Sequence, residues 1–182
     1  MKISVLKEAG YEEALLGISL SYNSPLSRMP RRAAALAPLD GGHNKFLEHI
    51  YVWLDIQAPR YWWSQFDTYR VGTSKQSEST MHTLLSGELK QHHFQYEVPE
   101  QILNVLNAYI REGNLEMAKA ILPESFLQRR IVTTNYKVLR NIVHQRSTHK
   151  LQEWRVFCSQ LGKHLEYPEF IWRKNDETHA TS

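Results

Sequence analysis

Cysteine is nearly absent from this sequence, which has one, Cys158, among 182 residues. A single cysteine excludes an internal disulfide framework, and it excludes a zinc site built on paired thiolates. No apolar run approaches the roughly 20 residues that a membrane-spanning helix needs. The N-terminus has one early lysine and then acidic residues, so it does not resemble a signal peptide. We therefore expect a cytoplasmic protein that has no membrane segment and no bound metal.

Positive charge is present only in small excess, as a net charge of +3 at neutral pH. Nucleic acid binding needs basic residues gathered on one face, so this small excess does not favour a nucleic acid partner.

The sequence also has no internal repeat and no low-complexity segment. Hydrophobic residues make up 42% of the chain, enough to bury a core. We expect a single domain over residues 1–172 and a polar tail at residues 173–182.

Hydrophobic periodicity predicts the elements of the first third of the chain. Residues 2–6 alternate as in a short strand, and residues 11–20 have the apolar spacing of a helix. Residues 21–45 are rich in Ser, Pro, Arg, Asn and Gly, which is typical of a long loop, with a short helix at residues 31–36. The clearest strand covers residues 48–57, where aliphatic residues alternate with aromatic and polar ones.

The period changes after Pro59, which we expect to end that strand because proline cannot donate to the ladder. A helical face follows and is expected to end near Gly72; its residues are Trp62, Gln65, Phe66 and Tyr69. Residues 73–96 are polar and without a clear pattern, so they predict an ordered loop. His92 and His93 are adjacent in that loop, which suits a surface pair better than two metal ligands.

The second half of the chain is predicted to be helical throughout. One helix begins at Pro99 and ends at Gly113, with an apolar stripe of Ile102, Val105, Leu106 and Tyr109. Further helices are expected at residues 115–122 and 133–146 and from Thr148 to Gly162. The predicted fold class is α+β, a small and mostly antiparallel sheet covered by several helices.

The helix at residues 133–146 carries the first candidate site. A stripe along one side of it, spaced for 3.6 residues per turn, consists of Asn135, Leu139, Ile142 and Arg146. A guanidinium on an apolar stripe needs a partner or a ligand. Arg146 either closes a salt bridge at the helix end or points, with Asn135, into a shared ligand pocket. The spacing leaves both alternatives open.

Two blocks of the chain resemble the conserved blocks of flavin-dependent thymidylate synthases. Gly42–Arg70 has a Gly-His start, a Glu-His pair, an Ala-Pro and a later Gln. Gly113–Trp154 has Leu-Pro, an Asn at the start of a helix, a second Asn six residues on and an Arg at the helix end. The two blocks follow the family's order and cover about two-fifths of the chain. The resemblance implies the family's α+β fold, in one thymidylate-synthase-complementing-like domain.

The resemblance also implies an activity. Members of that family are homotetramers whose active sites lie between subunits and hold FAD stacked on dUMP. NADPH reduces the flavin, methylenetetrahydrofolate supplies the carbon, and C5 of the pyrimidine is reductively methylated. No cysteine nucleophile takes part, which agrees with the single Cys158. The implied partner is a pyrimidine deoxynucleotide such as dUMP.

Residue by residue, the resemblance assigns the catalytic role to Arg146, which would bind the uracil edge and stabilise charge that develops on the ring. It assigns flavin contacts to His43, Glu48, Arg70, Asn135 and Asn141. It assigns nucleotide contacts to Gln65, Gln76 and Lys119, in addition to Arg146. Lys119 replaces an arginine that binds phosphate, so the charge is kept and the bidentate fork is lost.

The family's signature is rewritten between Thr68 and Met81. The family has roughly Arg-His-Arg-x-x-Ser-x-x-Glu-x-Ser-x-Arg-Tyr, and of these residues this chain keeps only Arg70. Thr73 stands in place of the family's Ser, and Gln76 stands in place of its Glu. Glu78 stands where the family contacts phosphate, and its charge should repel a nucleotide dianion.

Two hypotheses follow from this mixture. One is a divergent enzyme of the flavin-dependent thymidylate synthase type. The other is a non-catalytic homologue, which serves as a nucleotide- or flavin-binding or structural oligomer.

Overall fold

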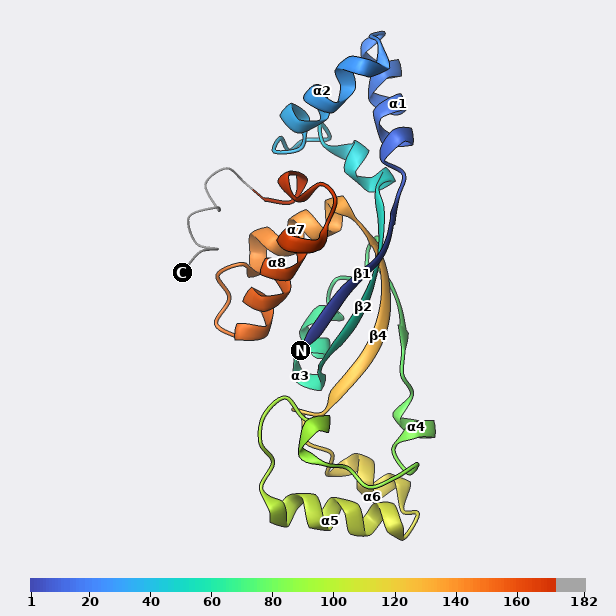
Figure 1. Ribbon diagram of the computed structural model, residues 1–182, viewed down its shortest axis with the longest axis vertical. Coiled ribbons are helices and arrows are strands. Elements are labelled where there is room, and N and C mark those ends of the chain that lie inside the picture. The colour runs from blue at the N-terminus through green and yellow to red at the C-terminus, as the bar shows by residue number, and fades with distance from the viewer. Residues whose placement is uncertain (173–182) are drawn as a thin grey trace. The chain divides into compact units, whose positions relative to one another are not determined.

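The computed structural model describes residues 1–172 (Figure 1), so the tail predicted at residues 173–182 lies outside the described residues. The chain forms two compact units. Unit 1 consists of Met1–Lys2, Ile56–Thr68 and Gln76–Ile131. Unit 2 consists of Ile3–Asp55, Tyr69–Lys75 and the described residues from Val132 onward. The expectation of a single domain over residues 1–172 stays a prediction.

One sheet runs through the described residues in the order β1-β2-β4-β3. Its strands are β1 (Lys2–Ala9), β2 (Tyr51–Pro59), β3 (Ser74–Ser77) and β4 (Leu127–Asn135). The start of β2 meets the end of β4, because the amide of Tyr136 donates to the carbonyl of Ile50 over 3.0 Å. Neighbouring strands are antiparallel, so the predicted α+β class with a small antiparallel sheet is confirmed.

Unit 2 contains helices from both ends of the chain. They are α1 (Tyr11–Tyr22), α2 (Met29–Leu36), α7 (Tyr136–Arg146) and α8 (Gln152–His164), with 3₁₀ turns at Leu26–Arg28, Lys45–His49 and Pro168–Phe170. Figure 1 shows α7 and α8 side by side. Leu139, Trp154 and Phe157 are fully buried, so these two helices pack through large apolar side chains.

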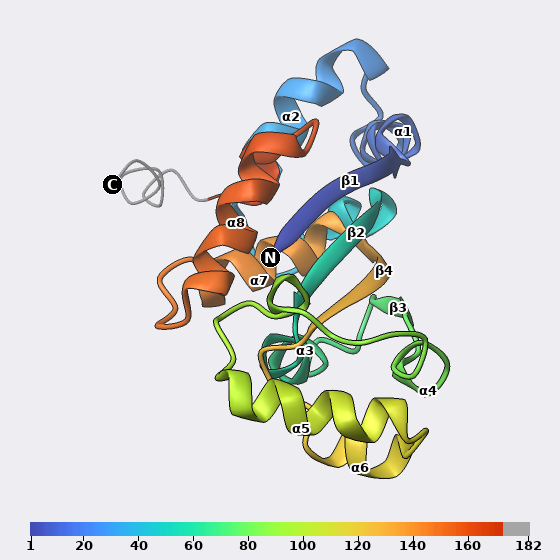
Figure 2. The same cartoon turned by 60° about the horizontal axis from the view of Figure 1, so that its bottom comes forward.

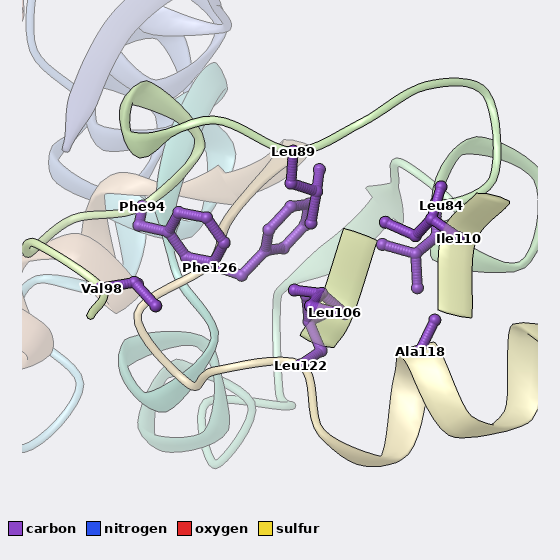
Figure 3. Packing of buried hydrophobic residues seen from close by; sticks show 9 residues of the cluster. All are labelled: Leu84, Leu89, Phe94, Val98, Leu106, Ile110, Ala118, Leu122 and Phe126. Atoms are coloured by element: carbon purple, nitrogen blue, oxygen red, sulfur yellow. The ribbon is translucent and has the colours of Figure 1, made fainter. Parts of the chain in front are cut away.

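Unit 1 contains the remaining helices of the described chain. They are α3 (Arg60–Phe66), α4 (Thr80–Thr83), α5 (Glu100–Arg111) and α6 (Leu115–Ala120), with a 3₁₀ turn at Gln91–His93. Helices α5 and α6 lie beside each other (Figure 2). Their core is a cluster of buried apolar side chains (Figure 3), namely Leu84, Leu89, Phe94, Val98, Leu106, Ile110, Ala118, Leu122 and Phe126.

The prediction that the second half is helical throughout is wrong at β4. The run from Ile131 to Thr134 is β-branched, which favours a strand, and the helix starts only at Tyr136. Asn135 is the N-cap of α7, where its side chain accepts a hydrogen bond from the amide of Val138 over 3.0 Å. The polar loop predicted at residues 73–96 also contains the short strand β3 and the helix α4.

Two boundaries around β2 and α3 differ from the prediction. Glu48 lies in the 3₁₀ turn Lys45–His49, and β2 begins at Tyr51 and includes Pro59 as its last residue. Helix α3 ends at Phe66, because the amide and hydroxyl of Thr68 both donate to the carbonyl of Gln65 and close a tighter turn. Tyr69 is therefore not on the face of this helix.

The apolar stripe predicted for α5 is wrong in part. Ile102 and Val105 are 45% and 51% exposed, whereas Leu106 and Ile110 are buried. The buried side also includes Asn107, whose amide group bonds the backbone N–H and C=O of Leu89. A satisfied polar residue can thus take a core position that hydrophobicity alone assigns elsewhere.

Candidate functional site

The residues that the resemblance selected fall in both compact units. Six belong to unit 2: His43, Glu48, Arg70, Asn135, Asn141 and Arg146. Three belong to unit 1: Gln65, Gln76 and Lys119.

Arg146 is the last residue of α7 and is half-buried. Its Nε donates a hydrogen bond to the hydroxyl of Tyr69 over 2.9 Å. Its Cζ lies 4.8 Å from the ring centroid of Trp154 and 5.7 Å from that of Tyr69, within the range of cation–π contact. Aromatic groups, rather than a carboxylate, hold this guanidinium among the described residues. The salt-bridge alternative for Arg146 is therefore not what this part of the chain shows.

A line of hydrogen bonds continues from Arg146 to Asn141. The Tyr69 hydroxyl donates to Oε1 of Gln145 over 2.8 Å. Nε2 of Gln145 in turn donates to Oδ1 of Asn141 over 3.1 Å. Gln145 and Asn141 are four apart on one helix, a spacing that places side chains next to each other. Two of the selected residues, Asn141 and Arg146, are thus linked through two residues that sequence reasoning did not select.

Asn135 lies at the other end of α7 from Arg146. The two are 11 residues apart in the helix, which at 1.5 Å per residue separates them by about 16 Å. A ligand that contacts both side chains would have to span most of the length of α7. Asn135 is 7% exposed and its oxygen caps the helix, so its Nδ2 is the group left to donate to a ligand.

Part of the signature segment Thr68–Met81 packs against the start of α7. Gly72 has a φ of +67°, and a Cβ at its position would lie 3.1 Å from Nδ2 of Asn135. The hydroxyl of Thr134 donates to the carbonyl of Gly72 over 3.1 Å and lies 3.3 Å from the hydroxyl of Thr73. Part of the rewritten segment thus packs on the end of β4 and on the N-cap of α7.

His43 lines a cavity of about 510 Å³ in unit 2. The polar side chains around it include Lys45, His49 and Ser21, and the apolar part includes Phe46 and Leu36. This volume is in the range of sites for small ligands, roughly 300–1,000 Å³. Sequence reasoning missed Lys45 and His49, although both lie within six residues of His43.

Arg70 and Glu48 are exposed, as His43 is. Neither of them lines this cavity.

In unit 1, Lys119 lies next to the rewritten signature. Its Nζ donates to the hydroxyl of Thr80 over 3.3 Å and lies 3.1 Å from Sδ of Met81. Glu78 pairs with the backbone of Arg129, donating its amide to the Arg129 carbonyl over 2.9 Å. Gln65 is half-buried in α3, and Gln76 is exposed in β3. The structure thus brings Lys119 to the signature.

The remaining thiol and the histidine pair lie where the structure indicates neither a nucleophile nor a metal site. Cys158 is buried, and burial raises the pKa of its thiol to about 12, so it stays protonated and unreactive. The rings of His92 and His93 lie 4.1 Å apart on the surface. Within residues 1–172 no cluster of three or more His, Cys, Asp or Glu side chains is placed to hold a metal ion. No helix in this part of the chain is long and apolar enough to span a membrane.

The sequence matches a known protein family over most of its length. The model of the thymidylate synthase complementing protein family matches residues 18–167. This chain belongs to that family. The resemblance noted for Gly42–Arg70 and Gly113–Trp154 is thereby confirmed, because both blocks lie inside the matched range.

Solved structures agree with this family fold. A flavin-dependent thymidylate synthase ThyX from Helicobacter pylori, complexed with FAD and dUMP, superposes with a TM-score of 0.80 at 18% identity, covering 94% of this chain and 98% of that chain. A second structure of that Helicobacter pylori enzyme with FAD and dUMP, at 2.31 Å resolution, gives a TM-score of 0.78 at 18% identity and covers both chains fully. No curated protein sequence gives a match.

As a member of the thymidylate synthase complementing family, the chain shows where its own signature has changed. Tyr69 bonds Arg146, Gly72 lies against Asn135, and Thr80 bonds Lys119. Residues of the segment Thr68–Met81 thus have defined contacts in each unit.

Proposed function

We propose that this protein is a divergent enzyme of the flavin-dependent thymidylate synthase type. Its reaction would be the reductive methylation of C5 in a pyrimidine deoxynucleotide such as dUMP, with the carbon taken from methylenetetrahydrofolate. The observation that carries the proposal is the half-buried guanidinium of Arg146, which an aromatic hydroxyl and two rings hold in a defined direction.

Arg146 has the catalytic role in this proposal. A preorganised positive charge stabilises negative charge that develops on a reacting ring more effectively than water can, because it needs no reorganisation. The guanidinium also binds the edge of the pyrimidine through its remaining N–H groups, whose planar fork suits adjacent acceptors. Both functions require that the group keep one orientation.

Five residues of unit 2 are proposed to bind FAD: His43, Glu48, Arg70, Asn135 and Asn141. Their donor and acceptor chemistry fits a flavin, because amides and an imidazole suit the ring edge, and a carboxylate accepts from ribityl hydroxyls. The cavity at His43, of about 510 Å³, offers room for part of such a ligand. When bound, the flavin supplies the hydride that the reductive methylation needs, and NADPH is its proposed reductant.

Three residues of unit 1 are proposed to bind the nucleotide: Gln65, Gln76 and Lys119. A lysine contributes a compact, mobile charge to a phosphate instead of a fixed fork. Because Lys119 bonds Thr80, its ammonium group has a defined starting position. We further propose that the protein is a cytoplasmic homotetramer with its sites between subunits.

The first experiment is the absorbance spectrum of the purified protein after desalting, with and without added FAD. It is followed by an assay for dTMP from dUMP, methylenetetrahydrofolate and NADPH. Flavin bands that survive desalting, together with product, are the expected result. A colourless protein that ignores FAD and forms no product from dUMP or dCMP would overturn the enzymatic proposal.

Arg146→Ala is the matching variant. We expect turnover to fall about a hundredfold or more, as when a preorganised donor is removed from an active site, with the oligomeric state unchanged. The control is Arg111→Ala, because Arg111 is exposed and pairs with Glu88 on the surface. Equal turnover of the two variants would contradict the role given to Arg146.

The second candidate function is a non-catalytic homologue that binds nucleotide or flavin. Glu78 favours it, because its amide is locked to Arg129 and its carboxylate stands at a position where the family contacts phosphate. Binding of FAD or dUMP in thermal shift experiments without turnover would support this alternative.

A further inference from the structure

Tyr69 stands where the family signature has a histidine, and the resemblance assigns no role to a tyrosine there. Its hydroxyl contacts two side chains of α7 that lie 76 and 77 positions further along the chain. Its ring meets the buried ring of Trp154 edge to face, with centroids 6.0 Å apart. Such a residue is anchored on both its apolar and its polar side.

We propose that Tyr69 is a positioning residue that locks the guanidinium of Arg146 through Nε and presents its two Nη groups to a planar ligand edge. The inference rests on the proposed function for the identity of that ligand, a pyrimidine base. The fixing of the guanidinium itself rests only on contacts within unit 2.

The direction of the hydrogen bonds follows from chemistry. The guanidinium of Arg146 can only donate, so the Tyr69 hydroxyl accepts from Nε. The hydroxyl then uses its own proton for Oε1 of Gln145, and the Gln145 amide nitrogen donates to Asn141. Each of these three hydrogen bonds has a fixed donor and a fixed acceptor, so each side chain restricts the rotation of the next. The phenol is thereby held with a lone pair toward Nε.

The plane of the guanidinium is fixed by a second contact. Trp154 is fully buried in α8, and its ring lies 4.8 Å from Cζ of Arg146. A ring over which the guanidinium lies restrains its tilt, and the bond to Nε restrains its rotation. The two Nη groups remain as a planar pair of donors beyond Cζ, the arrangement that suits two acceptors on one flat ring.

The test begins with the guanidinium itself. In a ¹⁵N-labelled protein, the Nε–H signal of Arg146, assigned by its loss in Arg146→Lys, is expected to exchange slowly with water. Tyr69→Phe should make it exchange rapidly, and Tyr51→Phe should leave it unchanged, because Tyr51 is an exposed tyrosine of β2 in the same unit. An unchanged signal in Tyr69→Phe overturns the proposal.

The second measurement is dUMP affinity by calorimetry. Tyr69→Phe should weaken binding about tenfold, the effect of one charge-assisted hydrogen bond, and Tyr51→Phe should not. In the Arg146→Lys background, Tyr69→Phe should have no further effect, because lysine lacks Nε. Equal losses in both backgrounds would indicate a merely structural tyrosine and overturn the proposal.

Two further outcomes separate the possible failures. If Tyr69→Phe does not fold, Gln145→Leu tests the same line from its exposed end and should also weaken dUMP binding; unaltered binding counts against the proposal. If the wild type does not bind dUMP, the proposed function and the assigned ligand fail, while the Nε–H signal still decides whether Tyr69 positions Arg146.

Discussion

The substitution Gly72→Ala tests how the rewritten signature supports α7. Gly72 has a φ of +67°, and a Cβ there would lie 3.0 Å from Cγ2 of Val138 and 3.1 Å from Nδ2 of Asn135. Contacts this short oblige the neighbours to move by a few tenths of an ångström. The Asn135 side chain is the neighbour that matters, because its oxygen caps α7 through the amide of Val138.

Two costs contribute to the expected destabilisation. An alanine held in the left-handed region costs about 1 kcal/mol, and disturbing an Asn N-cap costs about 1 kcal/mol. Gly72→Ala should therefore lower the free energy of unfolding by about 2 kcal/mol. Gly41→Ala is the matched control: Gly41 has a φ of +68°, and a Cβ there meets nothing within 4 Å. Gly41→Ala should lower the free energy of unfolding only by the cost of the left-handed backbone, about 1 kcal/mol.

Urea unfolding followed by tryptophan fluorescence measures both variants. The same titration in an Asn135→Ala background gives a second comparison, in which Gly72→Ala should cost less than in the wild type because no cap remains to disturb and only the backbone cost and the contact with Val138 are left. Equal destabilisation of Gly72→Ala and Gly41→Ala, or full additivity with Asn135→Ala, would refute the link between the signature and the cap.

Three further perturbations address the core, the pH dependence and the thiol. Leu106→Ala, at a fully buried position of α5, is expected to lower the free energy of unfolding by about 2–5 kcal/mol. Ile102→Ala, on the exposed side of the helix, should change it by less than about 0.5 kcal/mol in the same urea titration. Burial raises the pKa of Glu8 above its ordinary value, although a hydrogen bond from Tyr136 opposes this shift. Folding therefore favours the protonated form, and the stabilisation is present at low pH and is lost as the pH rises through the raised pKa. Glu8→Gln should flatten this part of the curve of melting temperature against pH, and an unchanged slope would contradict the assignment. Burial raises the pKa of Cys158 to about 12, so a thiol reagent at neutral pH should modify it only after unfolding. Rapid labelling of the native protein would show that the thiol is accessible.

Local patterns in the sequence were sufficient for much of the fold. The first strand, α1 and α2 follow from short-range periodicity and from composition, and the structure contains each of them. The family relationship was also visible in two blocks of residues, because a family retains residue types at fixed spacing. The strand β4 was missed, although its β-branched residues before Asn135 were a usable signal. The failed stripe on α5 had no such signal, since both sides of that helix carry apolar residues.

The sequence by itself thus determined the fold class, the family and the candidate residues Arg146, Asn135 and Asn141. Only the tertiary structure decided which side chains these residues contact. Tyr69 and Arg146 are 77 positions apart, and their hydrogen bond exists because the chain folds residues 69–75 and the C-terminal helices into one unit. Periodicity reports the environment along a single element, whereas a hydrogen bond between distant segments depends on how the whole unit packs.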